Sequence, residues 1–440
     1  MGILDRLFKT KKSEHQWIRF GRASDEVKTS EQVQLWDQAM VDFENQRYLD
    51  SFEKLLKYLL IPNIDNVRTT RNSDKIEFEL EQGSGLVTGW MDSQNFCALA
   101  QITIGDTYSI GLMRQLLESS LELQHSRFAI DENNYLIIKF DGFTKESSPY
   151  RLFYGLREIA LRADKQDDLL LSEFDHLKAV DNTNVTEYSE TIKKTKYQYF
   201  QLILQKALDP GAVGKLDTKK YTGAWTYIYL STLYKIDYLI SPEGKSMEII
   251  ENAHKNYFIQ NGEDILDKTE MLKESILELS EIDQTKLERE LYYVHHTFGL
   301  KSAVPYGIIS EFIVTEMNPL EWYKSQGHTE VSLAICHYIV GYLVYNFSLP
   351  EPANELAHYY FLCNDSEYFS ALGLQTPELM DDESFKKSES KLKSGIRKII
   401  DKHLVKFPEL NTDVTISCQS RLDFCISYLT MMNNLNLNGR

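Results

Sequence analysis

Apolar residues recur at two different spacings in the N-terminal part of the chain. At residues 112–121 they recur every three or four positions, which is the spacing of a helix with one buried face. At residues 128–140 they alternate with polar residues on either side of a turn, which predicts the two strands of a hairpin. A breaker at 147–149 precedes a second helical pattern at 152–168. Helix, hairpin and helix together can cover one face of a small sheet.

Upstream of this unit the pattern predicts a helix and three more strands. The helix begins with a capping box at 29–32, whose side chains can accept hydrogen bonds from the first free amides, and helical spacing ends before Pro62. The first strand alternates apolar residues with glutamates, which is typical of a half-buried strand with an acidic outer face. The predicted order is helix, three strands, helix, two strands, helix, in an antiparallel sheet with strands at 76–81, 86–91, 96–104, 128–130 and 136–140.

Beyond a polar, acidic stretch at 177–190 the spacing is almost entirely helical, and one of the helices that it predicts covers residues 287–298. Residues 331–347 are apolar on most faces but too short and too polar for a membrane span, so we expect a buried central helix. The predicted organisation is therefore a flexible segment at 1–26, an α+β domain at 27–176, a linker at 177–190 and an all-α domain at 191–440.

The N-terminal residues allow two interpretations. Four apolar residues between positions 3 and 8, followed by lysines at 9, 11 and 12, could form a short amphipathic foot on a membrane. The alternative, which we favour, is a frayed and soluble end. The start of the chain has neither the long apolar core nor the cleavage site of a secretory signal, and we expect a cytoplasmic protein.

Composition narrows the class of partner. The formal net charge of −17 argues against a general binder of nucleic acid or of acidic membranes, which the average field would repel. The 5 cysteines are widely spaced and form no CxxC pair, which favours reduced, buried thiols. The 26 tyrosines and 21 phenylalanines suit pockets and protein interfaces, but large helical cores use aromatic residues as well. Both explanations of the aromatic content stay open.

Catalytic motifs are missing from the sequence. It has no phosphate-binding loop, no dinucleotide-binding glycine pattern, no nucleophile elbow and no zinc-peptidase motif. His295 and His296 are the best metal candidates, yet adjacent histidines on a helix point about 100° apart and residues 291 and 292 offer no third ligand. We therefore predict no metal, no cofactor and no catalytic residue.

Two other arrangements resemble sites only superficially. Cys336 and His337 suggest a nucleophile and its base, but neighbours on a helix do not face each other, and this helix is strongly apolar. The acidic runs at 164–168 and 378–383 lack the ligand order and the central glycine of a calcium-binding loop. We expect the first pair in the core and the acidic runs at solvated helix ends or loops.

The N-terminal order of elements resembles a known fold. The segments LMRQLLESSLELQHSRFAIDENNYLIIKF (112–140) and LFYGLREIALRADKQDDLL (152–170) are similar to the type III secretion chaperone-like fold shared with the YbjN family. The resemblance covers residues 27–176 and places the Ala-Asp end of the family's final helix at Ala163 and Asp164. It implies a small αβ domain, often dimeric, that binds other protein chains and catalyses nothing. The chain departs from this family by carrying the long helical part that follows the region of resemblance.

We therefore predict a bacterial, non-enzymatic protein-interaction or chaperone-like adaptor that buries an apolar segment of another polypeptide. The candidate partner contacts are Trp90, Phe96, Phe128 and Ile130. The alternative is an enzyme or small-ligand-binding protein with a site around His295, His296 and the tyrosine-rich helices, which a deep polar pocket would favour. Nucleic acid and membrane are not expected partners, and a homodimer is compatible with the prediction.

Overall fold

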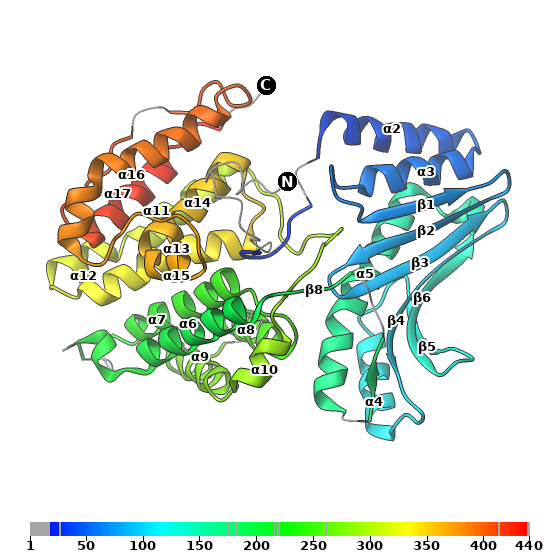
Figure 1. Cartoon of the computed structure of the whole chain (residues 1–440), viewed down its shortest axis with the longest axis horizontal. Coiled ribbons are helices and arrows are strands. Elements are labelled where there is room, and N and C mark those ends of the chain that lie inside the picture. The colour runs from blue at the N-terminus through cyan, green and yellow to red at the C-terminus, as the bar shows by residue number, and fades with distance from the viewer. Residues whose placement is uncertain are drawn as a thin grey trace. The chain divides into compact units, whose positions relative to one another are not determined.

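The chain folds into two compact units. The computed structural model describes residues 18–25, 28–174, 176–180, 184–214, 216–217, 221–260, 262–411 and 414–437. The αβ unit consists of Ala23–Glu187 and Tyr292–Leu300, and the helical unit consists of Met1–Arg22, Tyr188–Leu291 and Lys301–Arg440. The structure is 58% helical and 13% strand, with an antiparallel sheet and helices followed by a helical region, which confirms the predicted fold class (Figure 1).

The αβ unit is built around an antiparallel sheet with the strand order β1-β2-β3-β4-β6-β5, and β7 pairs with β4. Strand β1 extends the predicted set of strands at one edge. The elements are α2 (Ser30–Glu44), α3 (Tyr48–Leu59), β1 (Val67–Arg71), β2 (Lys75–Gln82), β3 (Gly85–Asp92), β4 (Asn95–Ile104), α4 (Ile110–Ser120), β5 (Arg127–Ile130), β6 (Tyr135–Phe143), η1 (Thr144–Glu146), α5 (Pro149–Glu173), β7 (Lys178–Ala179), β8 (Thr186–Glu187) and β9 (Tyr292–Tyr293).

Local sequence explains where the helices of the αβ unit begin and how closely they pack. The Thr29 side chain accepts from the Gln32 amide and completes the predicted capping box of α2. Ser148 caps α5, and Pro149 occupies the first helical position, where no amide hydrogen is needed. Gly155 of α5 lies so close to the Phe140 ring that a Cβ atom would meet it at 2.2 Å. The glycine therefore lets α5 approach the sheet.

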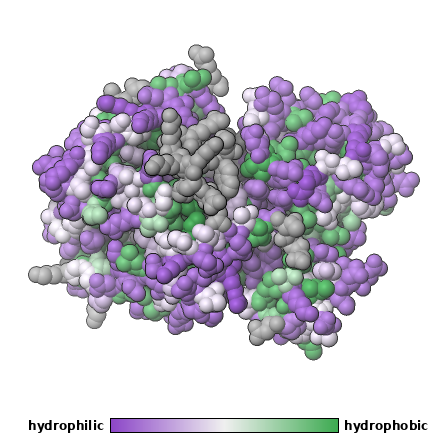
Figure 2. Space-filling model, in the orientation of Figure 1, coloured by the Kyte–Doolittle hydropathy of each residue, from purple (hydrophilic) through white to green (hydrophobic). Residues whose placement is uncertain are grey.

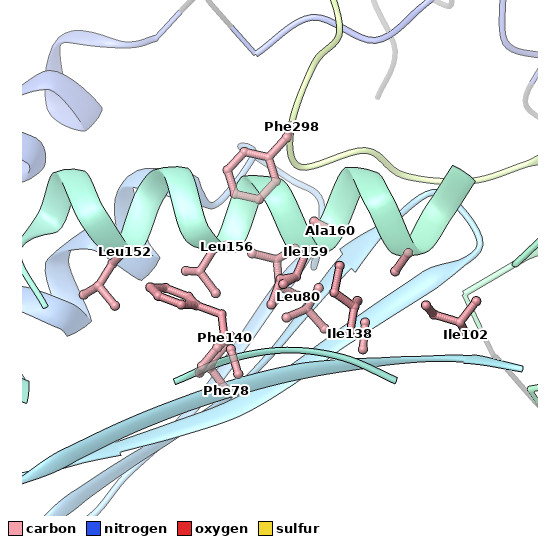
Figure 3. Close-up of a cluster of buried hydrophobic side chains, with 14 of the residues drawn as sticks. Phe78, Leu80, Ile102, Ile138, Phe140, Leu152, Leu156, Ile159, Ala160 and Phe298 are labelled. Carbon is pink, nitrogen blue, oxygen red and sulfur yellow. The ribbon is translucent and has the colours of Figure 1, made fainter. Parts of the chain in front are cut away.

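Helix α5 covers the core face of the sheet (Figure 3). Alternate residues of β2, such as Phe78 and Leu80, point toward it and are buried, while the glutamates between them point to the other face. Phe140 of β6 and Leu156 of α5 belong to the same buried cluster. Buried and exposed positions alternate from Ile76 to Leu80, and this alternation fixes the register of β2, because a slip of one residue would turn Glu77 and Glu79 into the core.

The extended segment Tyr292–Leu300 is part of the αβ unit, although the residues on either side of it in sequence belong to the helical unit. Phe298 is fully buried among the core residues beside α5 (Figure 3). The Phe298 amide donates to Gln82 Oε1 at 2.9 Å, and Gln82 Nε2 donates to the Phe298 carbonyl at 3.3 Å. Thr297 Oγ1 donates to the Glu81 carbonyl at 2.6 Å. We call residues 292–300 the returning segment.

The predicted helix that includes the returning segment is wrong. Apolar spacing continues to residue 298, but helix α10 (Gln284–Arg289) ends at Arg289, and β9 pairs with β8 instead. The end of β2 takes up the hydrogen-bonding groups of the returning segment, which a helix would have used internally. The compact units therefore divide the chain differently from the predicted boundaries, since the αβ unit takes nine residues from beyond 190.

Helices make up most of the helical unit, with α13 at its centre. Every described residue of α13 from Val331 to Gly341 is buried, as expected for a central helix. Within the described ranges, no helix has the length and the apolar run needed to cross a bilayer. The elements are α6 (Glu190–Leu208), η2 (Pro210–Val213), α7 (Gly223–Lys235), η3 (Ile236–Ile240), α8 (Gly244–Phe258), α9 (Ile265–Ser280), α10, α11 (Tyr306–Met317), α12 (Leu320–Ser325), α13 (Thr329–Asn346), α14 (Glu351–Asn364), α15 (Ser366–Ala371), α16 (Asp382–His403) and α17 (Arg421–Asn433).

Residues 18–22 are held by the helical unit, although the sequence placed them in a flexible N-terminal segment. The Arg22 guanidinium pairs with Asp237 at 2.7 Å and with Glu251 at 2.9 Å, and it lies 4.0 Å from the centre of the Tyr345 ring. The Gly21 amide donates to the Tyr238 carbonyl at 2.8 Å. Sequence pattern could not reveal these contacts, because each partner lies more than 200 positions away. The suggested amphipathic foot at residues 1–12 lies outside the described residues.

Candidate interaction surface

The four candidate partner contacts occupy different places in the αβ unit. Phe96 of β4 is 1% exposed and belongs to the core, so it is not available to a partner. Phe128 of β5 is partly buried and packs against the same core. Ile130, at the end of β5, is 41% exposed. Trp90 of β3 is half-buried and pairs with Cys97 on the face opposite the core. The structure therefore does not gather the four residues into one surface.

A shallow hollow of about 530 Å³ surrounds Trp90 on the open face of the sheet. Its apolar floor includes Trp90, Cys97 and Leu99, and Arg68 and Glu79 line it as well. The Lys75 ammonium lies 5.1 Å from the centre of the Trp90 ring, which is within the range of a cation–π contact. Much of the tryptophan surface is therefore already in contact with the chain itself.

A row of exposed apolar side chains lies on helix α4 and at the residue after it. Ile110 is 90% exposed, Leu117 is 70% exposed and Leu121 is 88% exposed, while Met113 between them is 41% exposed. Their spacing of three or four residues places them along one side of the helix. We call these four residues the α4 stripe. In Figure 2 apolar surface is visible in the region of α4.

The α4 stripe was missed by the sequence pattern, which assigned Leu112, Leu116, Leu117 and Leu121 to one buried face. The structure buries Leu112 and Leu116 in the core and leaves the other two in solvent. Two rows of apolar residues exist on α4, one facing the sheet and one facing away. The signal that could have found the second row was the apolar residue at position 110, which is in phase with Leu117 and out of phase with Leu116.

His295 and His296 lie in the returning segment, and each contacts a different carboxylate. His295 Nδ1 is 3.1 Å from Glu81 Oε2, and His296 Nε2 is 3.8 Å from Asp164 Oδ2. Among the described residues, no group of three or more histidine, cysteine or acidic side chains is arranged to hold a metal ion. The histidines also belong to the αβ unit, whereas the tyrosine-rich helices belong to the helical unit.

The acidic run that begins at Asp164 holds the turn between β2 and β3, so the expectation of a solvated helix end is wrong there. Asp164 Oδ1 accepts from the Ser84 amide at 3.0 Å, and Ser84 Oγ donates to Asp167 at 2.6 Å. Burial raises the pKa of Asp167 well above its usual value, and the nearby carboxylates of Asp168 and Asp164 raise it further. Tyr292 donates to Asp168 at 2.8 Å and ties the returning segment to the same helix.

Cys336 and His337 are both buried in α13, as expected. Burial raises the pKa of the Cys336 thiol well above its ordinary value, so the reactive thiolate is disfavoured. Burial also lowers the pKa of His337 well below its ordinary value, and His337 Nδ1 shares a hydrogen bond of 2.9 Å with the Tyr360 hydroxyl. The pair therefore lacks the electropositive and accessible setting of a catalytic cysteine.

The chain was compared with protein-family models, with curated proteins and with solved structures. No family model matches the chain, and neither a curated protein nor a solved structure matches it significantly. The resemblance to secretion chaperones stays a prediction from the sequence, and any functional argument depends on the geometry of the chain itself.

Proposed function

We propose that this protein is a protein-interaction adaptor that binds an apolar segment of another polypeptide through the α4 stripe. The observation that carries the proposal is the exposure of four large apolar side chains along one side of a single helix. Scattered exposed apolar residues are ordinary on protein surfaces, but contiguous apolar patches often mark interaction sites. The αβ unit would then act as a binding module, and no chemical reaction is assigned to it.

The stripe suits a partner that presents its own apolar row. Burying a large aliphatic side chain contributes about 1.5–3 kcal/mol, so Ile110, Leu117 and Leu121 together supply the apolar core of a modest interface. Arg114 and Glu118 flank the stripe on the same helix and are largely exposed. A polar border of this kind keeps the free protein soluble and sets the orientation of the partner. An amphipathic helix or an extended apolar segment fits this description.

Site-specific photo-crosslinking tests the proposal. A photo-reactive phenylalanine analogue is placed at Leu117 in one variant and at Glu118 in a matched control, because these neighbours point to different sides of α4. In a lysate of the source cells, we expect Leu117 to yield a crosslinked product of defined mass and Glu118 to yield much less. The product mass separates a partner polypeptide from a second copy of this chain.

Equal labelling from the two positions would show that α4 makes no directional contact. Crosslinking from position 90 alone would place the binding surface on the open face of the sheet. The proposal also requires that a double substitution, Leu117→Ser with Leu121→Ser, abolishes capture while leaving the urea unfolding midpoint unchanged. Loss of capture together with loss of folding would require a second pair of substitutions, Ile110→Ser with Met113→Ser, on the same stripe.

A further inference from the structure

A cavity of about 300 Å³ lies inside the helical unit, lined by residues of helices α6, α7, α13, α15 and α17. This volume is at the lower end of the range found for small-molecule sites. Most of the lining residues belong to these five helices, and Ala212, Asn364, Asp365, Leu379 and Met380 complete the wall, so the shape of the cavity depends mainly on helix packing. The cavity is independent of the α4 stripe, which belongs to the other unit.

A buried carboxylate and two cations are among the residues that line the cavity, and we call these three residues, Asp365, Lys235 and Arg421, its floor. Asp365 Oδ1 accepts from the Tyr199 hydroxyl at 2.5 Å and from Lys235 Nζ at 2.7 Å. The other oxygen, Oδ2, is buried and has no hydrogen-bond partner among the described residues. The Asp365 side chain is only 5% exposed. An unpaired buried carboxylate oxygen is costly, and a donor from a bound molecule would remove that cost.

The floor also carries two cations. Lys235 is buried, and its pKa is lowered by burial, an effect that the Asp365 carboxylate opposes. Arg421 donates from Nη2 to the Asn364 carbonyl at 2.7 Å and from Nε to Asn364 Oδ1 at 3.1 Å, which fixes the guanidinium beside the cavity. Two positive groups face one carboxylate, so the floor has an excess of positive charge.

His337 adds no charge to this balance. Its ring lines the cavity, and burial lowers its pKa well below the ordinary value, so the neutral form prevails near pH 7. At the mouth, Lys206, Glu330 and Glu367 are exposed to solvent, where screening weakens their fields without removing them. The buried charges of the floor therefore decide which ligand the cavity favours.

We infer that this cavity binds a small zwitterion with an amine and a carboxylate, the chemistry of a free amino acid. The Asp365 carboxyl turns so that the amine donates to Oδ2, which is closed to solvent in the free protein, and the ligand carboxylate lies between Lys235 and Arg421. A simple anion would leave Asp365 Oδ2 unpaired, and a simple amine would leave the excess positive charge uncompensated. A divalent cation is disfavoured by the two buried cations. Only a ligand that carries both groups satisfies both demands.

Calorimetric titration of the full-length chain tests the inference. The probes are the twenty standard amino acids, one at a time, with sodium acetate and ethylammonium chloride as ligands that carry one of the two groups. We expect at least one amino acid to bind with a dissociation constant below about 1 mM, and each single-group probe to bind at least about tenfold more weakly. Asp365→Asn removes the charge that holds the amine and should weaken binding about tenfold or more.

A second variant keeps the test decisive if Asp365→Asn does not fold. Lys206 lies at the mouth and makes no hydrogen bond or ion pair with the described residues, so Lys206→Ala should fold normally and weaken binding about threefold. Lys387→Ala, on the exposed side of α16, is the matched control and should bind as the parent does. The inference fails if no amino acid binds, if acetate alone binds as tightly, if a folded Asp365→Asn binds unchanged, or, where Asp365→Asn does not fold, if Lys206→Ala binds unchanged.

Discussion

The two units of this chain leave different kinds of group unsatisfied. In the αβ unit, α4 leaves a row of apolar side chains in solvent, while the carboxylates of the neighbouring α5 fix a turn of the sheet. In the helical unit, the central helix is buried along most of its length, and a carboxylate oxygen without a partner lies inside, at the floor of a cavity. An apolar row on the outside suits a large partner, whereas a charged cavity suits a small one.

Each unit also includes a short segment that is far away in sequence from the rest of that unit. The αβ unit depends on the returning segment, and the helical unit depends on residues 18–22, which are remote in sequence from the elements they join. The returning segment and residues 18–22 are held by hydrogen bonds, ion pairs and buried side chains that no local sequence pattern predicts. The four predictions below test this comparison, beginning with the largest expected effects.

The strongest test of the polar interior is Lys235→Met. The substitution keeps the size of the side chain but leaves the buried Asp365 with Tyr199 as its one remaining described donor. Breaking one side of a buried ion pair costs about 3–5 kcal/mol, because the remaining charge stays desolvated. Urea unfolding followed by circular dichroism should show this loss. Adding Asp365→Leu should restore part of the stability, and a single variant as stable as the parent would mean that the ion pair of Lys235 with Asp365 does not stabilise the fold.

A loss of similar size is expected in the αβ unit for Phe298→Ala. Phe298 is fully buried in the core, and removing such a ring typically costs about 3–5 kcal/mol. Leu300→Ala is the matched control, since Leu300 lies in the same segment and is 45% exposed. Hydrogen exchange of peptides from β2 and β4 reports the loss directly. If the two variants exchange alike, the returning segment does not complete the sheet core.

Acid should destabilise the helical unit through His358. Burial lowers the pKa of His358 to about 4, while the unfolded value is about 6.5. The unfolded state therefore binds the proton more readily, and stability is lost as the pH falls from about 6.5 to about 4, by about 3 kcal/mol. Burial also lowers the pKa of His254 to about 4 and that of His337 well below its ordinary value, and both act in the same direction.

Hydrogen exchange of peptides from α14 at pH 7 and at pH 4.5, corrected for the intrinsic rate, measures this effect. His358→Gln removes one of these titrating groups and should reduce the pH dependence by about a third if His254 and His337 supply the rest. An unchanged pH dependence in His358→Gln would assign the acid sensitivity to other groups of the unit.

The smallest change in the free energy of unfolding is expected for substitutions in the α4 stripe, the proposed binding surface. Leu117→Ser and Leu121→Ser remove exposed apolar surface, so each should change the free energy of unfolding by no more than about 0.5 kcal/mol. Leu116→Ser, which faces the core from the same helix, should cost about 2 kcal/mol or more. Equal losses in Leu116→Ser and Leu117→Ser would mean that the α4 stripe packs against part of the protein in solution.

The sequence by itself determined the α+β fold followed by helices, and it did so through local patterns. Alternation at 76–81, the turn residues that follow and the capping boxes act over a few positions, so they can be read directly. The burial of α13 could be predicted for the same reason, because the helix is apolar on nearly every face. The pattern at 112–121 predicted a single buried face on α4, and it missed that Leu117 and Leu121 would stay in solvent.

Tertiary structure alone decided where the chemistry lies. Asp365, Lys235 and Arg421 are separated by up to 186 positions, and no spacing rule connects residues whose helices meet only after packing. The same holds for Phe298, which completes a core that begins more than 200 residues earlier. Local sequence fixes the periodicity of each helix and strand. The free energy of burying their faces against distant parts of the chain decides which apolar side chains stay exposed and which polar atoms stay without a hydrogen bond. The two proposals made for this protein depend on those groups.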